Sequence, residues 1–450
     1  MRSRLSLLLG IAIVLGFAVT RHSLVASTKT PASPVAFTVA ARYEPLAWLK
    51  GGERFPLGAQ IFVSDGEREY PLVAAFAARA DPEISFDGTH ILFSGKRKQG
   101  DPWQIWEIST NGSDLHAIAP GSNDRVRPLY LPDGWIVFST KQNSRFTIEA
   151  ASETGGTPRS LFFAPGSALP MDVLHDGRIL FEAAYPLGGD SPEIYTVYPD
   201  GSGLESYRCD HGSARYNARQ LKSGDIVFTK NQTLARFTSP LAHEIAVAGP
   251  AGEYSGDIAE TGTGEWLVSW RKTTSQPFGL VLARPEHFPT TSFIRRKENV
   301  LQPRIIAPRP IPNRFPSALH EWKTSNLLAL DVYTSKYPIQ PGSVVSVRVY
   351  TTDSDGRSRI LGTAPVEPDG SFYIQVPGDQ PLKFELLDKQ SRSVHKQQGW
   401  MWARAGEQRV CVGCHAGPEH APENAVPAIL QKSTTPTDLS SASEPQTGGH

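Results

Sequence analysis

The chain has 450 residues, with 45 lysines and arginines against 45 aspartates and glutamates, so its formal net charge is zero. This balance excludes a strong global field that would recruit nucleic acid or an anionic membrane surface, and we expect neither as a partner. The 39 glycines and 37 prolines, with only 3 methionines, favour a turn-rich β protein over a helical one. The length allows two or three domains.

The first predicted element is a targeting segment at residues 1–28. Arg2 and Arg4 precede a 15-residue apolar run, Leu5 to Val19, and small residues follow at 25–27. The run is shorter than the roughly 20 residues of a membrane-spanning helix, which favours a cleaved signal peptide over a permanent N-terminal anchor. We therefore expect an exported, periplasmic protein that touches the membrane only through this segment, if the segment is retained.

Residues 40–300 repeat one frame, in which a glycine turn precedes a short apolar run, as in Asp87-Gly88 before Ile91-Leu92-Phe93. The glycines of the five clear turns are 40 to 47 residues apart, which is the repeat length of propeller blades: Gly88, Gly134, Gly177, Gly224 and Gly264. A partial copy begins at Gln60, and we expect the other end of the ring to complete it. The pattern predicts about six blades, with five or seven as alternatives.

The stretches "SFDGTHILFS" and "QIWEISTNGSDLHAI" resemble the blade repeat of the periplasmic TolB family, which implies a propeller that serves as a docking surface. Propellers of this type also precede prolyl-oligopeptidase catalytic domains. The chain after residue 300 contains no G-x-S-x-G motif, so a serine hydrolase is not expected.

The remaining chain divides into three further parts. Residues 301–317 are proline-rich and predict an extended linker. Residues 318–394 alternate apolar and polar side chains, with turns at Asp355-Gly356 and Asp369-Gly370, and predict a small antiparallel β-sandwich. The polar tail at 431–450 has the composition of a disordered segment.

Residues 411–415 read Cys-Val-Gly-Cys-His, the attachment sequence of c-type haem. Cys411 and Cys414 would form thioethers to one covalent haem c, and His415 would be an axial ligand of the iron. A zinc knuckle would need two more ligands, and His420 is not at a usual spacing. A thioredoxin-like pair would need a βαβ context. Cys209 is predicted to be a buried small hydrophobe.

The pattern "LGTAPVEPDGSFYIQVP", then "LKFELLD", then "GEQRVCVGCH" resembles the middle domain and haem motif of the hydrazine synthase alpha-subunit family. The resemblance implies the same roles for Cys411, Cys414 and His415. That family continues into a region with a further haem motif, whereas this chain has a single C-x-x-C-H. We therefore expect an all-β fold: a TolB-like propeller, a small sandwich and a short haem-binding segment at 395–430.

The second axial ligand decides whether such an iron carries electrons or binds small molecules. Met401 and His420 are the candidates nearest in sequence, followed by His395. His211 is more readily explained as a surface histidine, and no tyrosine is singled out by pattern. Trp400 and Trp402 could pack on a porphyrin or belong to the core.

The sequence favours an exported monohaem cytochrome-like protein in which the propeller docks a redox partner or subunit. The first alternative is a haem enzyme of small nitrogen compounds, as the resemblance implies. The second alternative is a binding scaffold with a structural haem. No catalytic residue can be named from the sequence.

Overall fold

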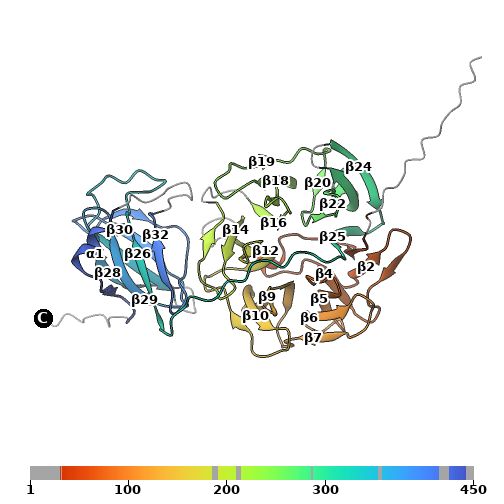
Figure 1. Ribbon diagram of the computed structural model, residues 1–450, viewed down its shortest axis with the longest axis horizontal. Helices are drawn as coiled ribbons and strands as arrows, with labels where there is room; N and C mark the ends of the chain where they lie inside the picture. The colour runs from red at the N-terminus through yellow and green to blue at the C-terminus, as the bar shows by residue number, and fades with distance from the viewer. Residues whose placement is uncertain are drawn as a thin grey trace, which may run out of the picture.

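The computed structural model describes residues 31, 33–184, 191–208, 214–284, 287–352, 357–414 and 425–441. The predicted targeting segment at 1–28 lies outside these residues, as do Cys209, His211, the Asp355-Gly356 turn, His415 and His420. The described chain is almost entirely β and forms two modules, a ring of sheets and a sandwich (Figure 1). None of its helices has the length and apolar content needed to cross a membrane.

Residues 35–305 form a propeller of six sheets, which confirms the predicted blade count. Blade 1 contains β25 (Asn299–Ile305), β1 (Val35–Ala40), β2 (Gln60–Ser64) and β3 (Glu69–Pro71). Blade 2 contains β4 (Ala78–Ile84), β5 (His90–Lys96), β6 (Gln104–Ser109) and β7 (His116–Ile118). Blade 3 contains β8 (Arg125–Tyr130), β9 (Trp135–Gln142), β10 (Arg145–Ser152) and β11 (Arg159–Ser160). Blade 4 contains β12 (Ala168–Val173), β13 (Ile179–Ala184), β14 (Pro192–Val197) and β15 (Glu205–Ser206). Blade 5 contains β16 (Arg215–Gln220), β17 (Ile226–Lys230), β18 (Thr233–Phe237) and β19 (Ile245–Ala246). Blade 6 contains β20 (Glu253–Tyr254), β21 (Ala259–Glu260), β22 (Trp266–Arg271), β23 (Gly279–Arg284) and β24 (His287–Ile294).

The five predicted glycine turns connect the innermost strand of blades 2 to 6 to the next strand outward. All five glycines adopt positive φ values between 76 and 93°, a region that glycine enters without the penalty of a Cβ atom. The apolar run after the first turn, Ile91-Leu92-Phe93 on β5, is completely buried between neighbouring blades. The repeat was therefore interpreted correctly, because its turns and buried strands both recur.

Blade 1 is closed by strands from the two ends of the propeller. β1 pairs with β2 on one side and with β25 on the other, so the copy that begins at Gln60 is completed as expected. The predicted start of the linker at residue 301 was wrong, because β25 runs to Ile305. Pro303 suggested a linker, but it lies next to Gln302, where the register between β25 and β1 shifts and a proline interrupts no regular ladder.

Charged side chains fill the axis of the ring. Arg219 of blade 5 reaches across to Glu83 of blade 2, at 2.9 Å. Glu83 also accepts hydrogen bonds from Arg304 (3.0 Å) and from Arg309 (2.6 Å) of the chain that leaves the propeller. The segment between β1 and β2, which includes the short helix η1 (Trp48–Lys50), closes one end of the ring and sends Arg54 to Glu182 at 3.0 Å.

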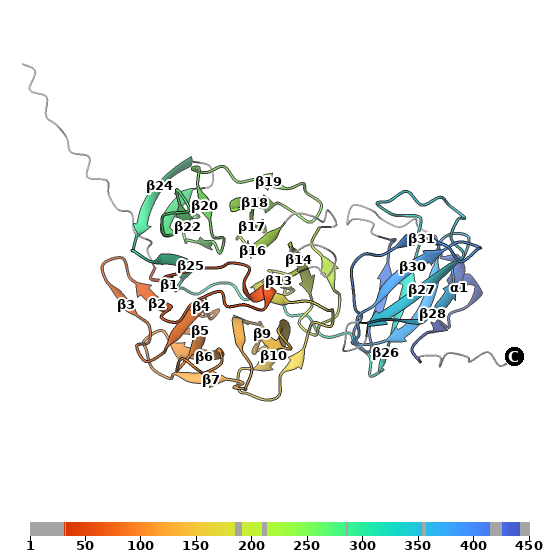
Figure 2. The ribbon, with the colours of Figure 1, turned by 180° about the vertical axis from the view of Figure 1, so that it is seen from behind.

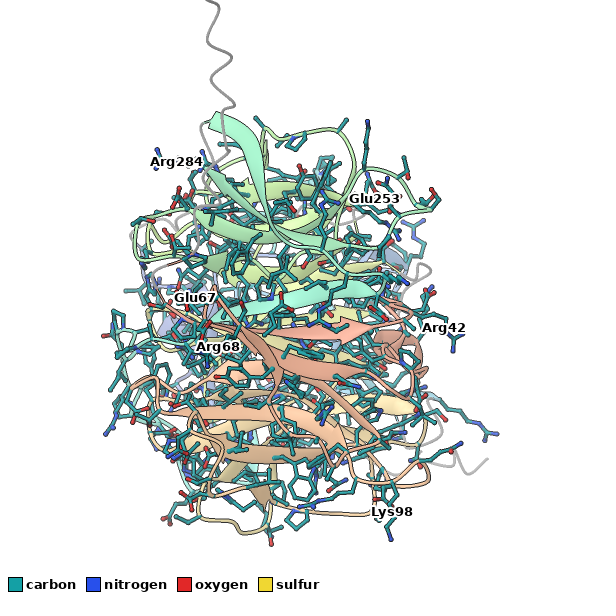
Figure 3. The ribbon with its side chains drawn as sticks, turned by 90° about the vertical axis from the view of Figure 1, so that its right-hand side faces the viewer. Arg42, Glu67, Arg68, Lys98, Glu253 and Arg284 are labelled. Carbon is teal, nitrogen blue, oxygen red and sulfur yellow. The ribbon has the colours of Figure 1, made fainter. Side chains whose placement is uncertain are left out.

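The opposite end of the ring opens into a pocket of about 600 Å³, bordered by Glu83, Arg219 and the proline-rich chain at 307–312. The outer rim carries charges of both signs, and Figure 3 shows Arg42, Glu67 and Lys98 projecting from the side of the propeller away from the sandwich. This mixed rim agrees with the balanced composition of the chain.

The C-terminal module is a sandwich of two four-stranded sheets. One sheet contains β32 (Gln408–Cys411), β26 (Thr324–Ala329), β29 (Phe372–Pro377) and β33 (Thr437–Asp438), in that order. The other contains β28 (Ser358–Pro365), β27 (Ser346–Thr352), β30 (Lys383–Leu387) and β31 (Ser393–Lys396). A short helix, α1 (Ala428–Lys432), contacts β29.

Two predicted boundaries differ from this arrangement. The haem-binding segment at 395–430 is not a separate unit, because β32 is an edge strand of the sandwich. Residues 431–441 of the predicted disordered tail are ordered, because β33 pairs with β29 and Leu439 is buried in the sandwich core. One apolar residue in a polar run was too weak a signal for the sequence interpretation.

The two modules are joined by a buried junction. Trp402 packs in the core of blades 3 and 4, with its ring centroid 5.1 Å from that of Phe162, and its Nε1–H donates to the Gly201 carbonyl at 3.0 Å. Arg404 donates to the Ser160 carbonyl at 3.1 Å, and Arg409 donates to the Leu204 carbonyl. These contacts attach the cysteine-bearing end of the sandwich directly to the propeller.

Candidate functional site

The first motif cysteine belongs to an edge strand whose register sets the direction of its thiol. β32 runs parallel to β26, with Ala329 opposite Cys411 and Leu327 opposite Arg409. Residues opposite each other share a face of the sheet, and Ala329 belongs to the sandwich core, so Cys411 faces the interior. The Cys411 carbonyl also accepts a hydrogen bond from the Leu330 N–H at 2.9 Å.

The second cysteine is held by the loop that follows β26. Cys414 forms an isolated parallel bridge with Ser335. Gly413 lies so close to this loop that a Cβ atom at that position would be 2.0 Å from the Thr334 carbonyl oxygen. The loop is itself braced by Asp331, whose carboxylate accepts from the Tyr333 N–H at 2.7 Å and the Thr334 hydroxyl at 2.8 Å. The bend between the two thiols therefore requires glycine.

The two thiols are unbridged and differ from those of a disulfide-exchange site. Burial, with smaller contributions from Cys411 and Asp331, raises the pKa of the Cys414 thiol to about 12. Thiol–disulfide enzymes need the opposite shift, because the thiolate is the attacking species. The site therefore disfavours thioredoxin-like chemistry.

A pocket of about 160 Å³ opens between the two sheets beside both thiols. It is lined mainly by apolar side chains, with two thiols, an imidazole, an amide and a thioether among them. The lining residues are Leu327, Leu328, Ala329, Phe372, Phe384, Leu386, His395, Gln397, Met401, Cys411, Gly413 and Cys414. The pocket thus lies at the edge of the sandwich where β31 and β32 end the two sheets.

Met401 lies in this pocket because the chain alternates faces as it passes the junction. Its backbone exchanges hydrogen bonds with Leu382, at 2.7 and 3.0 Å. Trp402 beside it belongs to the propeller core, while Met401 lines the pocket and packs against the cores of both modules. Trp400 lies against the propeller as well, in a small gap shared with Phe162. The idea that the tryptophans pack on a porphyrin in this pocket is therefore wrong for Trp402, which is core.

His395 lines the pocket from β31, on the sheet opposite Cys411. Burial lowers the pKa of its imidazole, which keeps the ring neutral near pH 7, the form that can bind a metal. The structure therefore brings together Cys411, Cys414, Met401 and His395 from the residues that the sequence indicated.

The pocket walls were missed by the sequence interpretation. Phe372, Phe384 and Leu386 come from strands whose only local signal is alternation, as in "KFELL", and alternation does not say what a face covers. Among the described residues, no group of three or more histidine, cysteine, aspartate or glutamate side chains is placed to hold a metal ion.

The lining fits one edge of a porphyrin. Two thiols separated by two intervening residues can reach the two vinyl groups of one haem, and apolar walls suit its hydrocarbon edge. The volume is below the roughly 300–1,000 Å³ of pockets that enclose a whole small-molecule ligand. A haem held here would therefore need a second covering surface for the rest of its ring.

Comparison with known proteins places this geometry in a broader context. Residues 333–416, which include both cysteines, match the hydrazine synthase alpha subunit middle domain. The whole fold is similar to a structure of Kuenenia stuttgartiensis hydrazine synthase, with a TM-score of 0.78, 18% identity, and coverage of 90% of this chain and 72% of that chain.

Two further solved structures match with lower TM-scores. TolB from Acinetobacter baumannii has a TM-score of 0.47, 14% identity, and coverage of 61% of this chain and 67% of that chain. A putative TolB from Agrobacterium tumefaciens has a TM-score of 0.44, 13% identity, and coverage of 59% and 90%. No curated protein sequence matches the chain.

Proposed function

We propose that this hydrazine synthase alpha-like chain is an exported protein that holds one haem c covalently at the edge of its sandwich and passes single electrons to and from a partner protein. One observation carries the proposal: both motif thiols and Met401 line the same apolar pocket. A bound haem would supply a reversible one-electron couple of its iron.

The residues of the chain would divide the work of holding such a group. Cys411 and Cys414 would each add a thiol across a vinyl group, and His415 would be the first axial ligand, as the motif predicts. Met401 would be the second side chain to hold the iron, because its thioether shares the pocket with the thiols. His420, the other candidate, lies outside the described residues.

The pocket walls would exclude water from the porphyrin edge. Leu327, Phe384 and Leu386 present only hydrocarbon to the pocket. Leaving an apolar surface in water forfeits roughly 25 cal/mol for every Å² exposed, so such walls favour insertion of the edge. The export expectation fits this chemistry, because the predicted signal segment would carry the chain out of the cytoplasm.

A second candidate function is catalysis on a small nitrogen compound. It is supported by the fold, which follows a structure of Kuenenia stuttgartiensis hydrazine synthase over 90% of this chain. The two functions differ at the second axial position, because a carrier has a ligand there and an enzyme keeps an open site for its substrate. A structural haem would show neither reversible reduction nor ligand binding.

The test begins with the protein produced together with a haem attachment system. A pyridine haemochrome spectrum should show one c-type haem per chain, and Cys411→Ala with Cys414→Ala should give colourless protein. The ferric protein should show the near-infrared charge-transfer band of a methionine ligand and, when reduced, should not bind carbon monoxide.

The Met401→Leu variant should lose that band, gain carbon monoxide binding and shift to a lower reduction potential, because a methionine ligand raises the potential. Met171→Leu is the matched control, since Met171 is buried in the propeller and an equal change there should leave the spectrum intact. Carbon monoxide binding by the unaltered protein would instead favour the catalytic function.

A further inference from the structure

The outer face of the sheet β28-β27-β30-β31 carries two rows of mainly polar and aromatic side chains. Figure 2, which views the molecule from behind, shows the strands of this sheet. In one row, Tyr350 of β27 lies between Ile360 and Lys383. In the other row, Glu385 of β30 lies between Arg348 and Lys396. We call Arg348, Lys383 and Lys396, with Tyr350 and Trp400, the cationic face.

The charges on the cationic face are only partly balanced. Glu385 binds Arg348 at 3.2 Å and lies 4.0 Å from Lys396, and it also accepts a hydrogen bond from the Tyr350 hydroxyl. Lys383 has no ion pair among the described residues. The two rows thus carry three cations and one carboxylate, and that carboxylate pairs with only two of the cations.

Two of the cations are held on aromatic rings. The Lys383 ammonium lies 4.6 Å from the ring centroid of Trp400, and the Lys396 ammonium lies 4.4 Å from that of Tyr350. Burial and repulsion by Lys396 lower the pKa of Lys383, which means that the charged ammonium is disfavoured there. An anion placed beside Lys383 would therefore stabilise its charged form. Tyrosine, tryptophan and arginine are also enriched where proteins bind each other.

The cationic face lies directly behind the candidate site. Alternation along β30 and β31 turns Lys383, Glu385 and Lys396 outward while Phe384, Leu386 and His395 line the pocket with the thiols. A partner seated on this face would therefore be separated from the pocket by a single sheet. Electron exchange favours such a short separation between donor and acceptor.

We propose that the cationic face is the docking surface for an acidic redox protein. The inference rests on the proposed haem function. One electron would pass from the reduced haem to the oxidised partner, so the iron loses one electron and the partner gains it, and no proton or leaving group moves. Opposite charge on the partner would steer its approach and set its orientation.

The experiment measures two properties of the Lys383→Glu/Lys396→Glu variant. The first is binding of poly-L-glutamate at low ionic strength, which needs no haem and should weaken at least about tenfold. The second is the oxidation rate of the reduced haem protein. It should fall about tenfold with the anion ferricyanide and should not fall with the cation tris(phenanthroline)cobalt(III), and added salt should reduce the difference.

The matched control is Lys98→Glu/Lys323→Glu, which makes the same charge change at two exposed lysines elsewhere and should alter both readouts less than threefold. The neutral variant Lys383→Gln/Lys396→Gln guards against misfolding and should give an intermediate loss with an unchanged melting temperature.

Equal poly-L-glutamate binding by the two double charge-reversal variants would overturn the docking surface, even if haem is present. Stronger binding to phosphatidylserine vesicles than to poly-L-glutamate would also overturn it, in favour of a membrane. Colourless protein that still binds poly-L-glutamate through Lys383 and Lys396 would refute the haem function and leave the face standing.

Discussion

Replacing Glu83 with glutamine should destabilise the propeller strongly, because this carboxylate joins three arginines at the axis of the ring. Glu83 is buried and accepts hydrogen bonds from Arg219 at 2.9 Å, Arg304 at 3.0 Å and Arg309 at 2.6 Å. Glutamine keeps the shape and one oxygen acceptor but removes the charge. Three guanidinium groups would then face one another, two of them largely buried and that of Arg309 34% exposed.

The expected magnitude follows from what remains to neutralise each arginine. Arg219 keeps Asp172 at 3.0 Å, and Arg304 keeps Asp257 at 3.2 Å. Arg309 keeps the Ile84 carbonyl at 3.0 Å and the ring of Phe86, whose centroid lies 4.5 Å from its Cζ. Removing one partner of a buried ion pair costs about 3–5 kcal/mol of stability. Because Asp172 and Asp257 remain, we expect the free energy of unfolding to fall by the lower value, about 3 kcal/mol. That is about a hundredfold in the unfolding equilibrium constant.

The assay is equilibrium unfolding in urea, which does not screen charges as guanidinium chloride does. Glu69→Gln is the control, because Glu69 pairs with Arg296 on the surface and such pairs contribute less than about 1 kcal/mol. Adding Arg309→Met to Glu83→Gln should restore part of the lost free energy of unfolding. A loss for Glu83→Gln no larger than that for Glu69→Gln would refute the reasoning.

Two further predictions concern the domain junction and the first turn. Trp402→Ala should lower the free energy of unfolding by about 3–5 kcal/mol, because it leaves a cavity between the two modules. The chain at 306–323 should then be cleaved more readily by protease. The control Trp322→Ala, at a 43% exposed position, should have neither effect. Hydrogen bonds from Ser85 and Thr89 lower the pKa of Asp87 to about 2, so its contribution to stability is complete above the usual pKa near 3.8 and is lost as pH falls through about 2. Carboxyl NMR titration should show this midpoint, and Asp87→Asn should flatten the dependence of stability on pH between 4 and 2; a midpoint near 3.8 would contradict it.

The propeller could be predicted because its signals are local. Gly88 and Gly177 each end a turn that needs positive φ, and the apolar run follows at once in both repeats. The innermost strands were harder to recognise because three of them contain, at a bulge, a proline that follows a residue with positive φ. The pairs are Asp81-Pro82, Arg127-Pro128 and Gln302-Pro303, and each lies where the strand register shifts. This recurring pair was the available signal for β25.

The candidate site could be predicted only in part. Cys411 and Cys414 could be recognised from their spacing alone, because covalent attachment of haem needs two thiols at a fixed separation in the sequence. The pocket walls depend on register between strands far apart in the chain, as when Ala329 lies opposite Cys411. The direction of Met401 depends on Trp402 entering the propeller, which is a contact between domains that no local pattern encodes.

The closure of blade 1 has a consequence for the order of events during folding. β1 cannot complete its pairing until β25 has been synthesised, and some 260 residues separate the paired residues Val39 and Val300. Loop-closure entropy opposes so distant a pairing, so this seam should form last and open first. A chain emerging amino end first would therefore carry an unsatisfied strand edge through nearly the whole of propeller assembly. Chaperone capture, or misassembly with a neighbouring molecule, would begin at that edge.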